Sequence, residues 1–260
     1  MAPHRASHPA RAYEALMDAA WPAPDRHDLG EWVLRAADGV TQRANSVWPR
    51  DPAPRPQEAL LEAARWYRMR RLPLIFQMAD TPANSGLNRF LDAQGFTRQS
   101  ETLILARPAG PQDGHPAGAG VEILDEPSEE WLHLWWSVDG RGGGQARETA
   151  RLIVTGCPAL YALARDDDGA PAAVGRLALA GATGGIYCMA TSPAHRRRGY
   201  AAAVLQALQS EGTARHVESF WLLVTAANSA ARQLYQQAGF EEAGRYLYRQ
   251  ERPRRALTGC

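Results

Sequence analysis

The chain has 260 residues, of which 45% are hydrophobic, enough for one large folded domain or two of ordinary size. Its formal net charge of +1 creates no field that would attract nucleic acid or an anionic membrane, and no apolar run approaches the roughly 18 residues of a membrane span. The basic residues apart from histidine are all arginines, which excludes lysine chemistry such as a Schiff base, and three widely spaced cysteines predict neither disulfides nor a zinc site. Because residues 1–10 also lack an apolar signal core, we expect a cytoplasmic protein. We further expect a monomer or homodimer that has small-molecule partners and binds no metal.

Residues 108–120 consist mainly of Pro, Gly and Ala and have the composition of a linker. This segment predicts a first domain over residues 1–107 and a second over residues 121–260. Hydrophobic periodicity and end signals predict helices and strands in the first domain. The expected helices cover Ala12–Ala20, Glu58–Arg70 and Ser85–Ala93, and the expected strands cover Trp32–Ala36, Val40–Val47, Leu74–Met78 and Thr102–Ala106.

The second domain shows the same alternation of strands and helices, which predicts an α/β fold with a mixed sheet. Two of its strands flank the acidic turn Asp166–Gly169 and have the pattern of a hairpin. The expected strands cover Val121–Leu124, Leu160–Arg165, Ala173–Leu179, Ile186–Thr191, Phe220–Val224 and Gly244–Tyr248, and the expected helices cover Glu129–Val138, Glu148–Val154, Tyr200–Ala214 and Ser229–Ala238.

The two halves repeat each other. Shifting the chain by 144 positions places Pro49 on Pro193, and the register then holds without a gap to the last strand. A repeat of this length is a whole domain and not a solenoid unit. The matching segments include Ala83-Asn84-Ser85 with Ala227-Asn228-Ser229, Gly95-Phe96 with Gly239-Phe240, and Leu103 with Leu247.

The most informative segment runs from an apolar strand through Pro193 to the start of a helix, with the sequence His195-Arg196-Arg197-Arg198-Gly199-Tyr200-Ala201. The first N–H groups of a helix have no intrahelical acceptor and lie at the positive end of the helix dipole. They can therefore hold a diphosphate, with the arginines adding charge. A run of arginines by itself is as often a solvent-exposed surface as an anion-binding site, so the neighbouring sequence must distinguish the two.

That sequence resembles the GNAT acetyltransferases, whose signature is Arg or Gln, two residues, Gly, one residue, and Gly or Ala. Arg196, Gly199 and Ala201 match it, and NSAARQLYQQAGF (228–240) resembles the family's second block. The resemblance implies two tandem GNAT-like domains, acetyl-CoA as co-substrate held between two splayed strands, and Tyr235 as the proton donor to the leaving thiolate. The residues that it assigns to coenzyme A are Met189, Thr191, Arg196, Arg197, Arg198, Gly199, Tyr200, Ala201 and Asn228.

The repeat offers an internal comparison. The first half places three prolines, Pro52, Pro54 and Pro56, where the second has its phosphate loop, and they remove N–H donors. The position of Tyr235 holds Leu91, which has no proton to give. We therefore predict a degenerate first domain and a functional Tyr235, whereas Gly239 and Phe240, which are retained in both halves, are predicted to be structural. Asn228 can act as a helix cap, a cofactor ligand or both.

No single general base can be assigned. The histone-acetylating branch has a glutamate where this chain has Gly185, so a water-relayed proton path is expected. Asp139, Glu148 and His133 are candidates only by position in the first helices of the second domain. The tryptophans there are more often core residues than a ligand platform, and Arg141 can hold a carboxylate. These tryptophans are Trp131, Trp135 and Trp136.

The sequence thus predicts direct acetyl transfer to a primary amine of a small molecule. The main alternative is a non-catalytic acyl-CoA-binding regulatory protein, and a third is an interaction protein with two inactive domains. The third does not explain why only one half keeps the loop.

Overall fold

The structure is a computed structural model that describes residues 9–110 and 120–252, so residues 111–119 of the predicted linker lie outside the described residues. The chain forms two compact units. Unit 1 comprises Met1–Pro22 and Leu103–Gly244, and unit 2 comprises Ala23–Thr102 and Arg245–Cys260. In the described part of the chain, no helix is both long and apolar enough to span a membrane.

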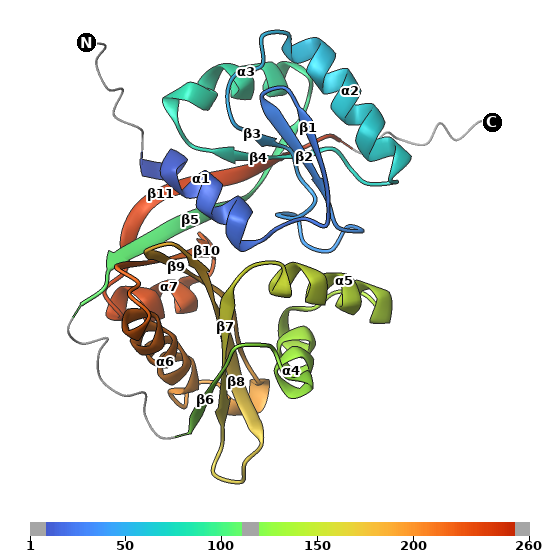
Figure 1. Ribbon diagram of the computed structural model, residues 1–260. Coiled ribbons are helices and arrows are strands. Elements are labelled where there is room, and N and C mark those ends of the chain that lie inside the picture. The colour runs from blue at the N-terminus through green and yellow to red at the C-terminus, as the bar shows by residue number, and fades with distance from the viewer. Residues whose placement is uncertain (1–8, 111–119, 253–260) are drawn as a thin grey trace. The chain divides into compact units, whose positions relative to one another are not determined.

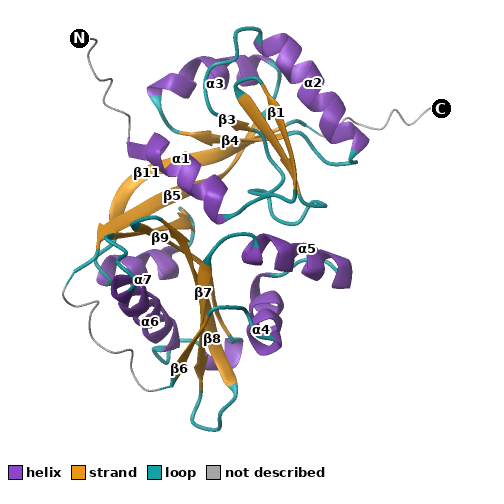
Figure 2. Ribbon diagram, viewed as in Figure 1, coloured by secondary structure: helices purple, strands orange, loops and turns teal. Residues whose placement is uncertain are grey.

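Unit 1 is a sheet with helices on both faces (Figure 1). Its helices are α1 (Pro9–Ala20), α4 (Glu129–Asp139), α5 (Gly144–Thr155), α6 (Tyr200–Ala214) and α7 (Ser229–Gln237), and its strands are β6 (Val121–Leu124), β7 (Ala159–Arg165), β8 (Pro171–Ala180), β9 (Thr183–Thr191) and β10 (Ser219–Thr225). Strands β6 to β9 are antiparallel to their neighbours, and β10 is parallel to β9. The predicted hairpin around the acidic turn is confirmed, and Figure 2 shows α6 and α4 on opposite sides of these strands.

The core of unit 1 lies beneath α6. Val204 and Leu208 are fully buried and pack in one cluster with Leu177 of β8 and Phe220 of β10. Apolar residues at spacings of three and four on one helix face predict this packing. The helix therefore has a fixed position on the sheet, and its N-terminus lies at the carboxyl end of β9.

A buried arginine holds the end of α1 on unit 1. Arg176 of β8 has no solvent exposure, and its Nη1 donates to the carbonyl oxygen of Ala20 at 2.9 Å. Its Nη2 lies 2.9 Å from Cys157 Sγ, and Trp21 stacks on Tyr187 of β9 with ring centroids 5.2 Å apart. These contacts explain why α1 groups with unit 1.

Unit 2 has its own apolar core, in which Trp32, Phe76 and Leu91 are buried. Its elements are β1 (Asp25–Leu29), β2 (Trp32–Ala36), β3 (Trp48–Pro49), α2 (Pro56–Met69), β4 (Ile75–Ala79) and α3 (Ser85–Ala93), with parts of β5 (Thr97–Pro108) and β11 (Glu241–Gln250). The described strands form a sheet of order β1-β2-β3 and a sheet of order β4-β11-β5-β10-β9-β8-β7-β6. The predicted mixed α/β fold is thus confirmed.

The last strands of the two repeats are exchanged. Elements α2, β4, α3 and β5 begin 144 residues before α6, β10, α7 and β11, which is the offset of the sequence repeat. However, β4 pairs with β11, in a register that places Met78 opposite Leu247, and β10 neighbours β5. The unit boundaries therefore fall inside β5 and β11.

The strand expected over Val40–Val47 is wrong. Residues 38–46 form turns and bends, and the described part of this segment joins the sheet through one bridge from Val47 to Phe76. The cause is Asn45, whose Oδ1 accepts the N–H groups of Ala37 and Gly39 and whose Nδ2 donates to the carbonyl oxygen of Val40. This side chain satisfies backbone groups that a strand would pair.

Candidate active site

The two central strands of unit 1 stop pairing part-way along. The parallel register of β9 and β10 ends at Ile186 and Leu222, although β9 continues to Thr191. A bulge begins at this point, because Cys188 has a φ of 54° and the register of β9 against β8 shifts. Met189 and Thr191, which are half-buried, lie beyond the bulge, where their main chain has no partner on β10 in the described register.

The arginine loop opens α6 in the conformation that an anion site needs. Gly199 is the N-cap, with a φ of 88°, and Arg197 also has a positive φ, of 62°. No acidic residue occupies the first turn, so the free N–H groups and the dipole of a 15-residue helix are unopposed. Arg196, Arg197 and Arg198 are exposed around it. These features suit a diphosphate.

The backbone conformation at position 199 explains why a glycine stands there. An added Cβ would meet nothing within 4 Å, so no protein atom requires a glycine at this position. The positive φ requires it, because side chains of L-residues rarely adopt that conformation. Ala201, half-buried in the first turn, keeps the helix start small. Tyr200 turns its ring toward the loop, with Arg198 5.6 Å from the ring centroid.

Tyr235 lies on α7 in the apolar core of unit 1. Its side chain is 7% exposed and packs beside Phe240 with ring centroids 6.1 Å apart. Burial raises the pKa of Tyr235 to about 12, and the negative charge of Asp139 contributes to the rise. The hydroxyl therefore keeps its proton at neutral pH. Gly239, at a φ of 82°, and the bond from Phe240 N–H to the carbonyl oxygen of Tyr235 end α7, so both retained residues are structural.

The comparisons with known proteins agree with this geometry. The family model described as "Probable histone acetyltransferase Rv0428c C-terminal" matches residues 8–249. The chain belongs to this family. Among curated proteins, it is 26% identical over 245 residues to the uncharacterized N-acetyltransferase YobR of Bacillus subtilis, covering 93% of this chain and 98% of that one. It is 31% identical over 129 residues to the probable histone acetyltransferase Rv0428c of Mycobacterium tuberculosis, covering 48% of this chain and 38% of that one.

Solved structures show the same fold. A GCN5-related N-acetyltransferase from Kribbella flavida superposes with a TM-score of 0.68 at 21% identity, covering 94% of this chain and 95% of that one. A tandem GNAT protein from the clavulanic acid biosynthesis pathway superposes with a TM-score of 0.63 at 15% identity, covering 92% and 86%. The fold is therefore that of the GNAT N-acetyltransferases, and a tandem GNAT protein is one of its structural neighbours.

In this GNAT fold, Asn228 is the N-cap of α7. Its Oδ1 accepts the N–H of Ala231 at 3.1 Å, and the residue is exposed. Its counterpart Asn84 makes no cap bond and donates instead to the carbonyl oxygen of Ala79 at 2.9 Å. The cap is thus particular to unit 1, and a cofactor contact by Asn228 stays a prediction.

Aromatic rings line the face of the unit 1 sheet against which α4 packs. Trp131 and Trp135 are buried, and Trp131 Nε1 donates to the carbonyl oxygen of Ala162, so both are core residues as predicted. An added Cβ at Gly185 would lie 2.7 Å from Cζ2 of Trp221. The indole of Trp221 therefore occupies the space that a glutamate at this position would need.

Of the three acidic or basic candidates, Asp139 is the one whose charge contributes to the raised pKa of Tyr235. Desolvation raises the pKa of its carboxyl, while a hydrogen bond from Trp135 and the charge of Arg141 lower it. Its charge also acts on Tyr235, as described above. By accessible surface all three residues are exposed, Asp139 and His133 on α4 and Glu148 on α5. Sequence position alone could not separate these three, because the link to Tyr235 joins helices far apart in the chain.

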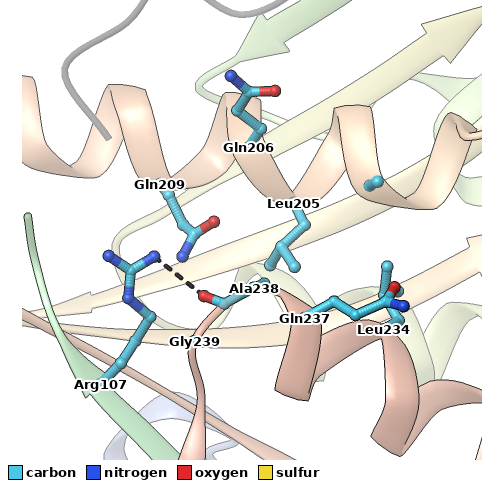
Figure 3. A pocket seen from close by; sticks show the side chains of 9 residues that line it. Arg107, Leu205, Gln206, Gln209, Leu234, Gln237, Ala238 and Gly239 are labelled. Atoms are coloured by element: carbon cyan, nitrogen blue, oxygen red, sulfur yellow. Dashed lines mark hydrogen bonds between the residues drawn. The ribbon is translucent and has the colours of Figure 1, made fainter. Parts of the chain in front are cut away.

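An open groove of about 420 Å³ runs between α6 and α7 (Figure 3). It begins at Ala202 in the first turn of α6, next to the arginine loop, and Leu205 and Leu234 form its apolar walls. At its far end Arg107 Nη1 donates to the carbonyl oxygen of Ala238 at 3.2 Å, and Gln209 is 4% exposed. The groove therefore continues the loop on the helix side of the sheet.

Proposed function

We propose that this chain is an N-acetyltransferase that transfers the acetyl group of acetyl-CoA directly to a primary amine of a small molecule. The observation that carries the proposal is the start of α6. Its first turn has free N–H groups with no acidic residue beside them, and it follows the N-cap Gly199, whose φ is positive. The helix follows β9, whose pairing with β10 ends at Ile186. A helix N-terminus of this kind binds phosphate groups.

Each part of the site has a distinct task. The first-turn N–H groups of α6 would hold the diphosphate, and Arg196, Arg197 and Arg198 would add charge-assisted contacts. The main chain of Met189 and Thr191 offers hydrogen bonds to an extended arm. Acetyl-CoA, when bound, supplies an activated acetyl thioester. Tyr235 Oη holds the proton that a leaving sulfur needs.

Unit 2 supports the proposal by contrast. We propose that residues 1–107 are a degenerate GNAT copy and residues 121–260 the catalytic one; helices α2 and α3 of the first copy lie in unit 2. Its helix α2 starts at Pro56, which has no N–H, and has Glu58 in its first turn, paired with Arg55 at 2.8 Å. A carboxylate there repels a diphosphate. The position of Tyr235 is occupied by the buried Leu91.

The test is a panel of amines incubated with acetyl-CoA while free CoA is measured. The panel includes small amines and lysine peptides, because a relative is named a probable histone acetyltransferase. Amine-dependent CoA release that disappears in the Gly199→Glu variant supports the proposal. Tight acetyl-CoA binding without release by any amine favours the non-catalytic regulatory protein, and absence of binding rules out both.

A further inference from the structure

The hairpin turn between β7 and β8 is hydrogen-bonded to the segment that precedes the arginine loop. Asp166 Oδ2 lies 2.9 Å from His195 Nε2, and the two side chains are 15% and 14% exposed. Nearby, Ser192 N–H donates to the carbonyl oxygen of Ala172 at 2.9 Å. The loop is therefore attached to the hairpin at two points, one of which is a shielded polar pair.

The turn that carries Asp166 is itself fixed. Its Oδ1 accepts the N–H groups of Asp168 at 3.1 Å and Ala170 at 2.8 Å, while its own N–H donates to the carbonyl oxygen of Ala170 at 2.9 Å. One carboxylate oxygen thus organises the turn and the other faces His195. The hydrogen bond from His195, together with those backbone bonds, holds the pKa of Asp166 below its usual range. Asp166 is therefore an ionised, immobile acceptor at neutral pH.

His195 touches both ends of the loop. It ends the short turn Pro193–His195 directly before Arg196, and its ring packs edge-on against Tyr200, the first residue of α6, with centroids 5.6 Å apart. Between these points lie Arg197 and Gly199 at positive φ. A non-glycine residue in this conformation persists only where its surroundings maintain it. The ring of His195 supplies such a constraint.

The second ring nitrogen of His195 indicates whether the residue relays a proton or positions the loop. His195 Nδ1 is buried and has no hydrogen-bond partner among the described residues. No described group continues a proton path beyond the ring. The contact with Asp166 is therefore positional. The sequence repeat agrees, because the position 144 residues before His195 holds Asp51, which has no imidazole, in the half that lacks the loop.

We propose that His195 and Asp166 are positioning residues for the diphosphate loop. By tying Arg196–Gly199 to the β7–β8 turn, the pair keeps the first N–H groups of α6 presented together, and so it sets the affinity for the cofactor through the backbone. The inference rests on the proposed function for the identity of that cofactor, but the ordering of the loop by the pair does not depend on it.

The test uses matched substitutions in the full-length protein. In His195→Gln, the amide Nε2 reaches about as far as His195 Nε2 and can still donate to Asp166, whereas in His195→Asn the side chain is too short. We expect acetyl-CoA affinity, measured by calorimetry, to fall on the order of tenfold in His195→Asn and in Asp166→Asn and to stay within about twofold in His195→Gln. The double variant His195→Asn with Asp166→Asn should bind no more weakly than either single variant, because the two residues act as a unit.

A second readout does not need the cofactor. Hydrogen exchange of the amides of residues 196–203 in the free protein should be faster in His195→Asn and Asp166→Asn, and unchanged in His195→Gln. If wild-type protein fails to bind acetyl-CoA while these amides still respond, the proposed function fails and the positioning role stands. Unchanged affinity and unchanged exchange in a folded His195→Asn variant, or a loss of melting temperature alone, overturns the inference.

Discussion

Substituting Gly199 by alanine tests the loop with a predictable magnitude. An added Cβ meets no atom within 4 Å, so the cost is conformational and not steric. Holding an L-residue at a φ of 88° costs roughly 1–2 kcal/mol. Gly199 is exposed, so the loop can relax when no ligand is bound, and binding must then restore the strained conformation. At about 1.4 kcal/mol per factor of ten, acetyl-CoA affinity should fall roughly 5- to 30-fold.

Calorimetric titration with acetyl-CoA and urea unfolding of the same variants check this value. Gly239→Ala is the matched control, because Gly239 has a φ of 82° but is held at the end of α7 by a bond from its N–H to the carbonyl oxygen of Gln236. That variant should lose stability and keep its affinity. Gly199→Glu, which adds negative charge at the positive helix end, should abolish binding. A Gly199→Ala variant with wild-type affinity refutes the reasoning.

Three further outcomes are expected. Calorimetry should give one acetyl-CoA per chain, because Pro56 and Glu58 occupy the corresponding helix start in unit 2, and two equivalent sites would contradict this. Tyr235→Phe should lower kcat and kcat/KM together by about 10²- to 10⁴-fold with little change in acetyl-CoA affinity, whereas a purely structural tyrosine would leave the rate intact and cost about 1 kcal/mol of stability. Asn228→Ala should reduce the free energy of unfolding by about 1 kcal/mol through loss of the α7 cap, and Asn84→Ala, which removes no cap, should reduce it less.

Local signals predicted the elements of the site well. The ranges of α3 and α6 were predicted from caps and periodicity as the structure has them, and the parallel strands on either side of α6 were predicted within a few residues. These features depend on neighbouring residues in sequence. The strand predicted over Val40–Val47 failed because one side chain, Asn45, satisfies backbone groups of residues 37–41, which precede it in the chain. Strand propensity takes no account of a side chain that forms hydrogen bonds with the backbone in place of a neighbouring strand.

Long-range pairings were out of reach of the sequence. The contact between Asp166 and His195 joins residues 29 positions apart on a turn and a loop, and each alone reads as an ordinary surface residue. Trp221 filling the space beside Gly185 is likewise a property of two neighbouring strands. The departure from the glutamate of the histone-acetylating branch was visible in sequence, but its steric reason was not.

The exchanged strands limit how this protein can be divided. A fragment that starts at residue 121 would lose Leu103 and Leu105 of β5, which are buried in the core of unit 1, and would leave the edge of β10 without its neighbour. An unpaired edge beside exposed apolar side chains promotes aggregation. Because unit 1 contains residues 103–108 of β5 and unit 2 contains residues 245–250 of β11, a cut at residues 108–120 would remove part of the sheet from each unit.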